Sequence, residues 1–189
     1  MKQFCCTLLF FLATLTSYAQ NFADFFQDKT LRVDYIFTGD ANRQAIYLDE
    51  LSQLPSWAGR QHHLSELPLA GNGQIIVKDV ATGQCIYKTS FSSLFQEWLS
   101  TDEARTTAKG FENTFLLPFP KKTVEVEITL YSPRKDVMAN FKHIVSPEDI
   151  LIHKRGTSHV TPHRYMLQSG SEKDCIDAVS YTHLRAHET

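Results

Sequence analysis

Residues 88–120 read KTSFSSLFQEWLSTDEARTTAKGFENTFLLPFP, and the rest of the fold is expected to assemble around this aromatic stretch. Large apolar side chains recur in it at the spacing of one helix face, namely Phe91, Leu94, Phe95, Trp98 and Leu99. Ser93 followed by Gln96 predicts a capping box at the start of that helix. A second apolar run contains Phe115 and Phe119. Each large side chain contributes about 2–3 kcal/mol when fully buried, so we expect structural core here rather than a ligand platform.

The segments on either side alternate between apolar and polar residues, which is typical of half-buried strands. The expected strands are residues 30–38, 44–54, 75–80, 84–90, 124–130, 141–145 and 149–153. The turn Ala81-Thr82-Gly83 separates two of them and predicts a hairpin in which Gly83 takes a positive φ. Ser100 and Glu103 repeat the capping spacing, so a second short helical turn is expected near Thr101.

Short strands between polar turns, without regular strand–helix alternation, predict an all-β fold. We expect mainly an antiparallel β-sandwich with one or two short helices. The chain has 189 residues, 42% of them hydrophobic, and a net charge of −2, which suits one ordinary domain. A charge so close to zero gives no reason to expect nucleic acid or an anionic membrane surface as a partner.

The N-terminal residues 1–19 have the features of a secretory signal peptide. Lys2 provides a positive start, and the apolar run over residues 4–15 is too short for a membrane span. Small residues stand at −3 and −1 of a cleavage site between Ala19 and Gln20. We therefore expect a protein that is secreted, or exported to the periplasm or cell surface, with no membrane span after signal cleavage.

The remainder of the chain divides into one domain and several short segments. The β-sandwich is expected at 20–153, a polar linker rich in Gly, Pro and Ser at 154–173, and the truncated start of another domain at 174–177. The last eleven residues, VSYTHLRAHET, resemble the translation of a sequencing adaptor. We therefore expect 178–189 to be an artefact and the natural chain to continue differently after Asp177.

Two cysteines, Cys85 and Cys175, remain after signal cleavage. An oxidising compartment would allow them to form one disulfide. Their wide separation in the sequence is weak support for pairing, and we favour two free thiols.

The sequence contains no recognisable catalytic or metal-binding motif. The natural part has no His-Glu-x-x-His, no Gly-x-Ser-x-Gly, no phosphate loop and no paired-cysteine metal motif. His159 and His163 have ligand-like spacing, but Pro162 lies between them and disfavours one regular helix that presents both. His183 and His187 belong to the adaptor-like tail. We expect no catalytic residue, no metal ligand and no cofactor in this chain.

Three aromatic residues outside the helical stripe could contribute to surface binding: Tyr47, Trp57 and Tyr87. Such rings can stack on sugars, but packing in the core or at its rim is the competing interpretation. A coplanar, exposed set would favour sugar binding, so the exposure of the three rings discriminates between the two interpretations.

Several blocks of the sequence together resemble one family. They are LRVDYIFTG, LPSWAG, GNGQIIVKD, IYKTSFSSLFQEW, FENTFLLPFPKKTVEVEITLY and SPEDILI. Over most of residues 21–177 the chain resembles the N-terminal domain of the secreted zinc metallopeptidases of the IgA-peptidase type. The later block VTPHRYMLQSGSEKDCID resembles the junction into the catalytic domain of that family. The resemblance implies a β-sandwich accessory domain followed by a zinc-binding catalytic domain, and no zinc ligand or catalytic glutamate of the family falls on this sequence.

Three functions remain open at this point. The first is a non-catalytic accessory domain of a secreted zinc metallopeptidase, whose partners would be its own missing catalytic domain and a protein or glycoprotein substrate. In that case zinc belongs to the missing domain. The second is a secreted glycan- or protein-binding β-sandwich module. The third is a folding aid or inhibitory pro-segment, which a processing site in the linker would favour.

Overall fold

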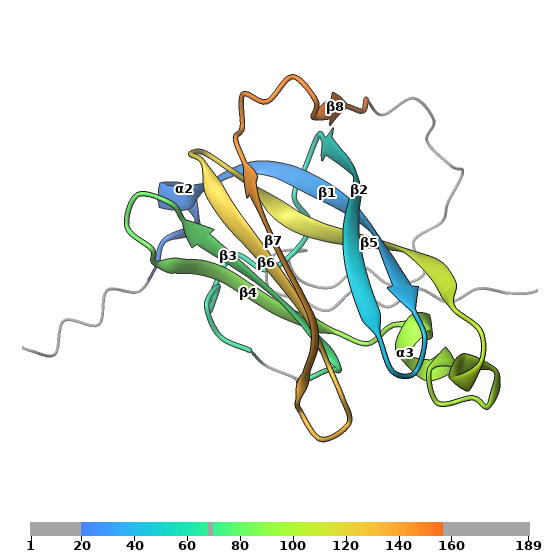
Figure 1. Cartoon of the computed structure of the whole chain (residues 1–189). Helices are drawn as coiled ribbons and strands as arrows, with labels where there is room; N and C mark the ends of the chain where they lie inside the picture. Colours follow the sequence, from blue (N-terminus) through green and yellow to red (C-terminus); the bar gives the residue numbers. More distant parts are fainter. Residues whose placement is uncertain (1–19, 68–69, 157–189) are drawn as a thin grey trace, which may run out of the picture.

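The computed structural model describes residues 20–67 and 70–156, which form two four-stranded sheets that lie one over the other (Figure 1). The elements are α2 (Phe22–Phe25), β1 (Phe26–Gly39), β2 (Gln44–Leu54), β3 (Gly73–Asp79), β4 (Cys85–Phe91), α3 (Leu94–Trp98), the 3₁₀ turn η1 (Glu103–Arg105), β5 (Lys109–Pro120), β6 (Val124–Tyr131), β7 (Val137–Val145) and β8 (His153–Lys154). The predicted all-β, mainly antiparallel sandwich with short helices is confirmed.

The first sheet has the strand order β5-β1-β2-β8 and the second has the order β4-β3-β6-β7. In the first sheet, Val33 of β1 lies opposite Leu51 of β2 and Phe115 of β5. Within the described residues, β2 and β8 form the one parallel pair. Strand β5 was not expected from the sequence because Pro118 and Pro120 close it. Its edge position explains how it tolerates them, since a proline cannot donate to a second neighbour.

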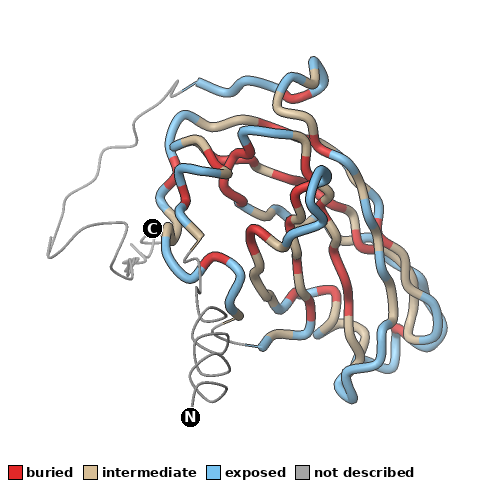
Figure 2. Tube along the Cα trace, turned by 90° about the vertical axis from the view of Figure 1, so that its left-hand side faces the viewer, coloured by how far each residue is buried: buried red, intermediate tan, exposed pale blue. Residues whose placement is uncertain are grey.

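The core lies between the inner faces of the two sheets, where buried residues alternate with more exposed ones along the strands (Figure 2). Strand β1 contributes Leu31, Val33, Tyr35 and Phe37, and β6 contributes Val124, Val126, Ile128 and Leu130. These residues follow the apolar–polar alternation from which strands were predicted at 30–38 and 124–130. The β3–β4 hairpin is also confirmed, with Gly83 at φ +70° and the amide of Asp79 donating to the carbonyl of Gln84.

A bulge in β2 changes which residues face the core. Asp34 of β1 lies opposite Glu50, whereas the next residue, Tyr35, lies opposite Leu48. Asp49 is therefore an extra residue, and the inward positions shift from Ile46 and Leu48 to Leu51. The bulge explains the irregular apolar spacing of residues 44–54, and it leaves Glu50 on the outer face beside Asp34.

The central aromatic stretch is only partly helical. Phe91 is the last residue of β4, and the helix begins three residues later, at Leu94, where the Ser93 hydroxyl accepts a hydrogen bond from the amide of Gln96. The prediction of a buried Leu94 was wrong, because this first helical residue points to solvent and is 71% exposed. Phe95 and Phe119 are buried, while Phe91, Trp98, Leu99 and Phe115 are partly buried against the core.

Two expectations near the C-terminal end were also wrong. Strand β7 begins at Val137, four residues before the strand expected at 141–145, and residues 149–152 form a turn instead of a strand. The carboxylate of Asp149 accepts a hydrogen bond from the amide of Leu151, at 2.9 Å, which favours the turn over a ladder. The signal peptide with Ala19, the linker after Gly156, Cys175 and the tail lie outside the described residues.

Candidate functional site

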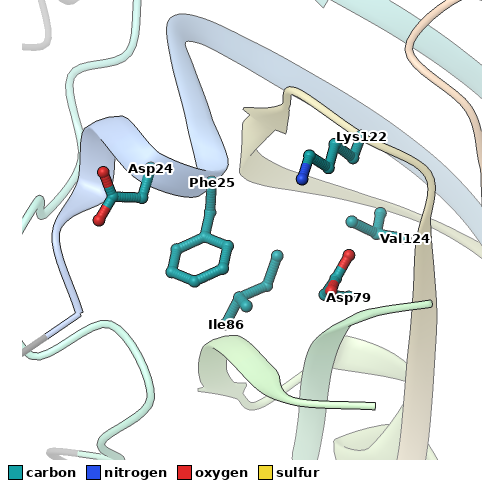
Figure 3. A pocket seen from close by; sticks show the side chains of 6 residues that line it. All are labelled: Asp24, Phe25, Asp79, Ile86, Lys122 and Val124. Atoms are coloured by element: carbon teal, nitrogen blue, oxygen red, sulfur yellow. The ribbon is translucent and has the colours of Figure 1, made fainter. Parts of the chain in front are cut away.

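One pocket lies between α2, the β3–β4 hairpin and the start of β6 (Figure 3). It is lined by Asp24, Phe25, Asp79, Ile86, Lys122 and Val124. Its volume of about 40 Å³ accommodates a few water molecules rather than a peptide or a sugar. The Asp79 carboxylate is already engaged, because it accepts hydrogen bonds from the amide and hydroxyl of Thr82 in the hairpin turn. This pocket therefore belongs to the framework of the hairpin.

The three aromatic candidates for surface binding do not form one platform. Trp57 and Tyr87 are only 7% and 5% exposed, whereas Tyr47 is 58% exposed. The Trp57 and Tyr87 rings pack edge to face with centroids 6.1 Å apart, and the guanidinium of Arg60 lies 5.1 Å from the centre of the Tyr87 ring. The surface-binding interpretation is therefore wrong for Trp57 and Tyr87, which pack in the core, and it leaves Tyr47 alone.

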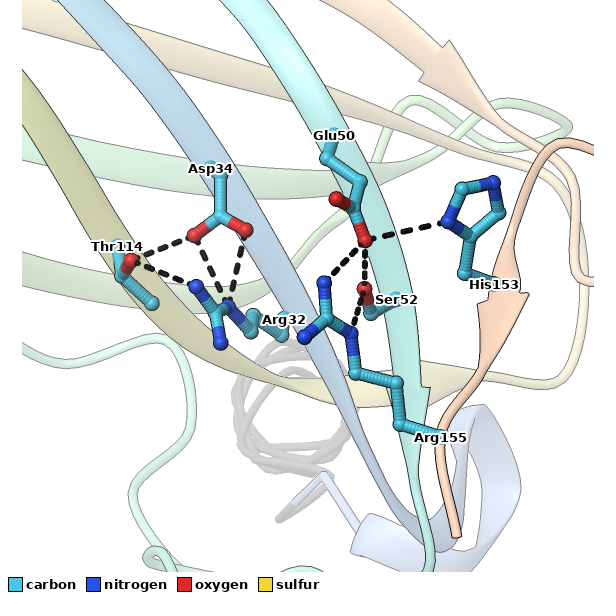
Figure 4. Close-up of polar contacts among 7 residues, drawn as sticks. All are labelled: Arg32, Asp34, Glu50, Ser52, Thr114, His153 and Arg155. Atoms are coloured by element: carbon cyan, nitrogen blue, oxygen red, sulfur yellow. Dashed lines mark hydrogen bonds and ion pairs between the residues drawn. The ribbon is translucent and has the colours of Figure 1, made fainter.

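A cluster of polar side chains covers the outer face of the first sheet where the described chain ends (Figure 4). We call Glu50, Ser52, His153 and Arg155 the exit clamp. One oxygen of Glu50, Oε1, lies 2.6 Å from Arg155 Nη2, 2.6 Å from the Ser52 hydroxyl and 3.3 Å from His153 Nδ1. Arg155 also donates from Nε to the Ser52 hydroxyl and from its amide to the carbonyl of Gln53. The clamp thus attaches the last described residues to β2.

A second cluster lies beside the exit clamp on the same face. Arg32 Nε lies 3.0 and 2.9 Å from the two carboxylate oxygens of Asp34, and the Thr114 hydroxyl donates to the first of them at 2.5 Å. These residues come from β1 and β5, so the cluster links two strands of one sheet, and the Asp34 charge also acts on Arg155 from a distance. It provides a comparison of similar chemistry for the clamp.

The electrostatics of the clamp favour a permanently charged contact. The hydrogen bond from Arg155, followed by that from Ser52, lowers the pKa of Glu50 to about 2. The same contact raises the pKa of Arg155. Ser52 donates to Glu50 and accepts from Arg155, so its hydroxyl links the carboxylate to the guanidinium. The arrangement is suited to holding two chain segments together.

The described residues do not fit a zinc site. Across residues 20–67 and 70–156, no three or more His, Cys, Asp or Glu side chains are grouped so that they could hold a metal ion. Glu50 and His153 approach each other, but the Arg155 guanidinium occupies the position beside Glu50 that a cation would need. Cys85 is a free thiol in this part of the chain, while His159 and His163 lie outside it.

The exit clamp was missed in the sequence because its members are far apart. Glu50 and Arg155 are separated by 105 positions, and Arg155 fell in the segment interpreted as a linker. The one local signal was the three-residue step from Leu48 to Leu51, which marks the bulge and turns Glu50 outward. No periodicity could connect that signal to a distant arginine.

Comparison with known proteins gives one family. The sequence profile described as Peptidase M64 N-terminus matches residues 21–142. No curated protein matches the chain. Among the helices that the structure describes, none has the length and apolar character needed to cross a membrane.

Proposed function

We propose a function from the premise that this chain belongs to the peptidase M64 N-terminus family, and so carries an N-terminal domain of a peptidase rather than its catalytic region. The proposed role is that of a non-catalytic accessory domain in a secreted zinc metallopeptidase of the IgA-peptidase type. In this role the sandwich is a rigid base that sets where the next part of the polypeptide starts and in which direction it leaves.

The exit clamp is the observation that carries this proposal. Two side-chain contacts from Arg155, together with the hydrogen bond that its backbone amide donates to the carbonyl of Gln53, fix the chain immediately before Gly156. A linker that begins at a fixed point and direction samples fewer positions than one that begins from a frayed strand. A following domain would therefore be presented to a large substrate within a restricted range of orientations.

The remaining parts of the proposal concern export, metal and partners. We place zinc in the domain that follows Asp177, because the described residues of this chain do not fit it. Export would follow from the signal peptide over residues 1–19, with cleavage before Gln20. The partners would be the catalytic domain of the same polypeptide and a protein or glycoprotein substrate, with no role for nucleic acid.

A protease assay tests whether catalytic activity requires residues beyond the printed chain. The chain as printed should leave casein and immunoglobulin intact in the presence of added zinc. The longer product of the uninterrupted gene should cleave at least one of them, and a chelator should abolish that cleavage. Chelator-sensitive cleavage by the printed chain alone would contradict the proposal.

Two matched variants of the longer protein test the clamp. Arg155→Met removes the clamp, whereas Arg32→Met removes the neighbouring arginine–carboxylate pair on the same face. We expect Arg155→Met to accelerate amide exchange at residues 153–156 and to lower kcat/KM for a protein substrate, with little effect on a short peptide. Arg32→Met should change neither quantity at the exit. Equal effects of both variants would mean that the clamp only stabilises the sheet.

The two competing functions make different demands. A glycan-binding module needs an aromatic platform, and the burial of Trp57 and Tyr87 removes two of the three candidate rings. An inhibitory pro-segment requires processing between residues 154 and 173 during maturation. The mass of the active, exported enzyme tests this function. A mature chain that starts within residues 154–173 would favour the pro-segment and contradict the accessory-domain proposal.

A further inference from the structure

Two adjacent aliphatic side chains project from the loop between β7 and β8. Ile150 is 94% exposed and Leu151 is 71% exposed. In Figure 1 this loop is the orange arch that extends away from both sheets. Single exposed aliphatic residues are ordinary on protein surfaces, whereas contiguous exposed apolar surface marks contact sites, and these two side chains are adjacent.

The loop presents this pair from an ordered turn. The carboxylate of Asp149 accepts from the amide of Leu151 at 2.9 Å, and its own amide donates to the carbonyl of Ser146 at 3.1 Å. The next residue, Ile152, is 6% exposed and packs with the core. The apolar pair is therefore held outward by local hydrogen bonds and by a buried anchor, so it does not turn inward.

A shallow, open hollow of about 510 Å³ accompanies the pair. Its lining consists of Pro147, Glu148, Asp149, Ile150, Ile152, His153 and Lys154. The hollow thus combines the apolar side chains of Ile150 and Ile152 with two carboxylates and one lysine, and Glu148 is the carboxylate at the start of the loop. The exit clamp holds Arg155 directly beyond this lining, so the chain leaves the domain next to the hollow.

The sequence that follows the exit has the complementary chemistry. Residues 160–167 read VTPHRYML, which combines apolar Val160, Tyr165, Met166 and Leu167 with basic Arg164. Arg164 is eight positions after Gly156, and an extended chain spans about 3.3–3.6 Å per residue. That length is sufficient for the chain to turn back over the loop that it has just left.

We propose that residues 160–167 of this chain dock on the loop between β7 and β8. The apolar side chains of the segment cover Ile150 and Leu151, and Arg164 faces Glu148. This interaction involves residues of this chain alone. It goes beyond the accessory role, because it does not depend on which domain follows. It converts the first part of the linker into a second attachment next to the exit clamp.

Hydrogen–deuterium exchange of the full chain tests the contact. We compare the parent with the double variant Ile150→Ser, Leu151→Ser and with a matched control, Leu116→Ser, Val137→Ser. The control residues are 53% and 62% exposed and lie on β5 and β7, outside the loop. Amides of residues 160–167 should exchange at least ten-fold faster in the loop variant, and at the parental rate in the control. Both variants should keep the parental melting temperature.

A charge swap provides the second arm of the test. Glu148→Lys should reduce protection of residues 160–167, and adding Arg164→Glu should restore it. The proposal is overturned if residues 160–167 of the parent exchange at the rate of an unstructured peptide, or if the loop variant changes nothing. Protection that increases with protein concentration would identify a second copy as the occupant and would also overturn it.

Discussion

His143 lies between the two sheets, where its Nε2 atom is 2.6 Å from the hydroxyl of Tyr35 and its ring stacks on Phe141. Burial lowers the pKa of His143 from 6.5 to about 4 and raises that of Tyr35. The folded protein therefore holds a neutral imidazole under conditions in which the unfolded chain already binds a proton. The stability that the neutral His143 contributes is fully present above pH 6.5 and is lost as the pH falls towards 4.

Between pH 7 and pH 5 this linkage should lower the free energy of unfolding by about 2 kcal/mol. Urea denaturation at the two pH values measures it. His143→Gln should remove most of the difference, because glutamine does not titrate. Glu50 should not interfere at pH 5, since its lowered pKa places its own loss of stability between pH 4.5 and about 2. An unchanged pH dependence in the variant would assign the effect to other groups.

Leu94 and Phe95 are neighbours in sequence with opposite environments. Phe95 is fully buried, with its ring centroid 6.2 Å from that of Phe37, whereas Leu94 is 71% exposed. Phe95→Ala should lower the free energy of unfolding by about 3–5 kcal/mol because it leaves a cavity. Leu94→Ala should change it by less than about 0.5 kcal/mol. Chemical denaturation measures both, and similar losses would mean that α3 lies differently on the core.

At the scale of elements, the sequence predicts strands well where one face is buried throughout. Alternation placed the inward residues of β1 and β6 correctly, and the turn chemistry at Gly83 placed the β3–β4 hairpin. It failed for β5, because prolines normally exclude a strand and only the edge position permits them. Alternation also failed to predict β8 and the exit clamp, because the contact between Glu50 and Arg155 joins residues 105 positions apart and leaves no local pattern in the sequence.

The packing of Phe91 of β4 against Gly73 of β3 predicts that no side chain fits at residue 73. A Cβ atom at this position would lie 2.2 Å from the Phe91 ring, which covers the start of β3. Gly73→Ala should therefore force the ring aside and lower the free energy of unfolding by about 1–3 kcal/mol. Gly110→Ala in β5 is the matched control, since its Cβ would meet Ile36 at an ordinary 3.6 Å. Thermal unfolding of both variants measures the difference, and equal melting temperatures would contradict this packing.

At the scale of the whole molecule, the folded domain extends beyond the last residue that the apolar–polar alternation assigns to it. The sequence suggested a boundary at residue 153, but the described fold includes Arg155, whose amide and side chain bond to β2. Arg155 also explains the burial of Ser52. Alternation alone would leave Ser52 on the solvent face of β2, but Arg155 lies over it and buries it fully. The end of a domain is thus decided by long-range polar contacts that hydrophobic periodicity does not record.

Two truncations distinguish the folded end from the adaptor-like tail. Removing residues 179–189 should leave the melting temperature unchanged if this segment is, as its resemblance to a translated adaptor suggests, not a product of selection for packing against this core. Ending the chain at Ile152 should lower the melting temperature by several degrees, since it leaves the carboxylate of Glu50 without Arg155 and His153 and uncovers Ser52. Differential scanning calorimetry of the full chain and both truncations measures these shifts. A clear fall on removing 179–189 would show that the tail belongs to the fold, and an unchanged value for the chain ending at Ile152 would show that the clamp contributes nothing to stability.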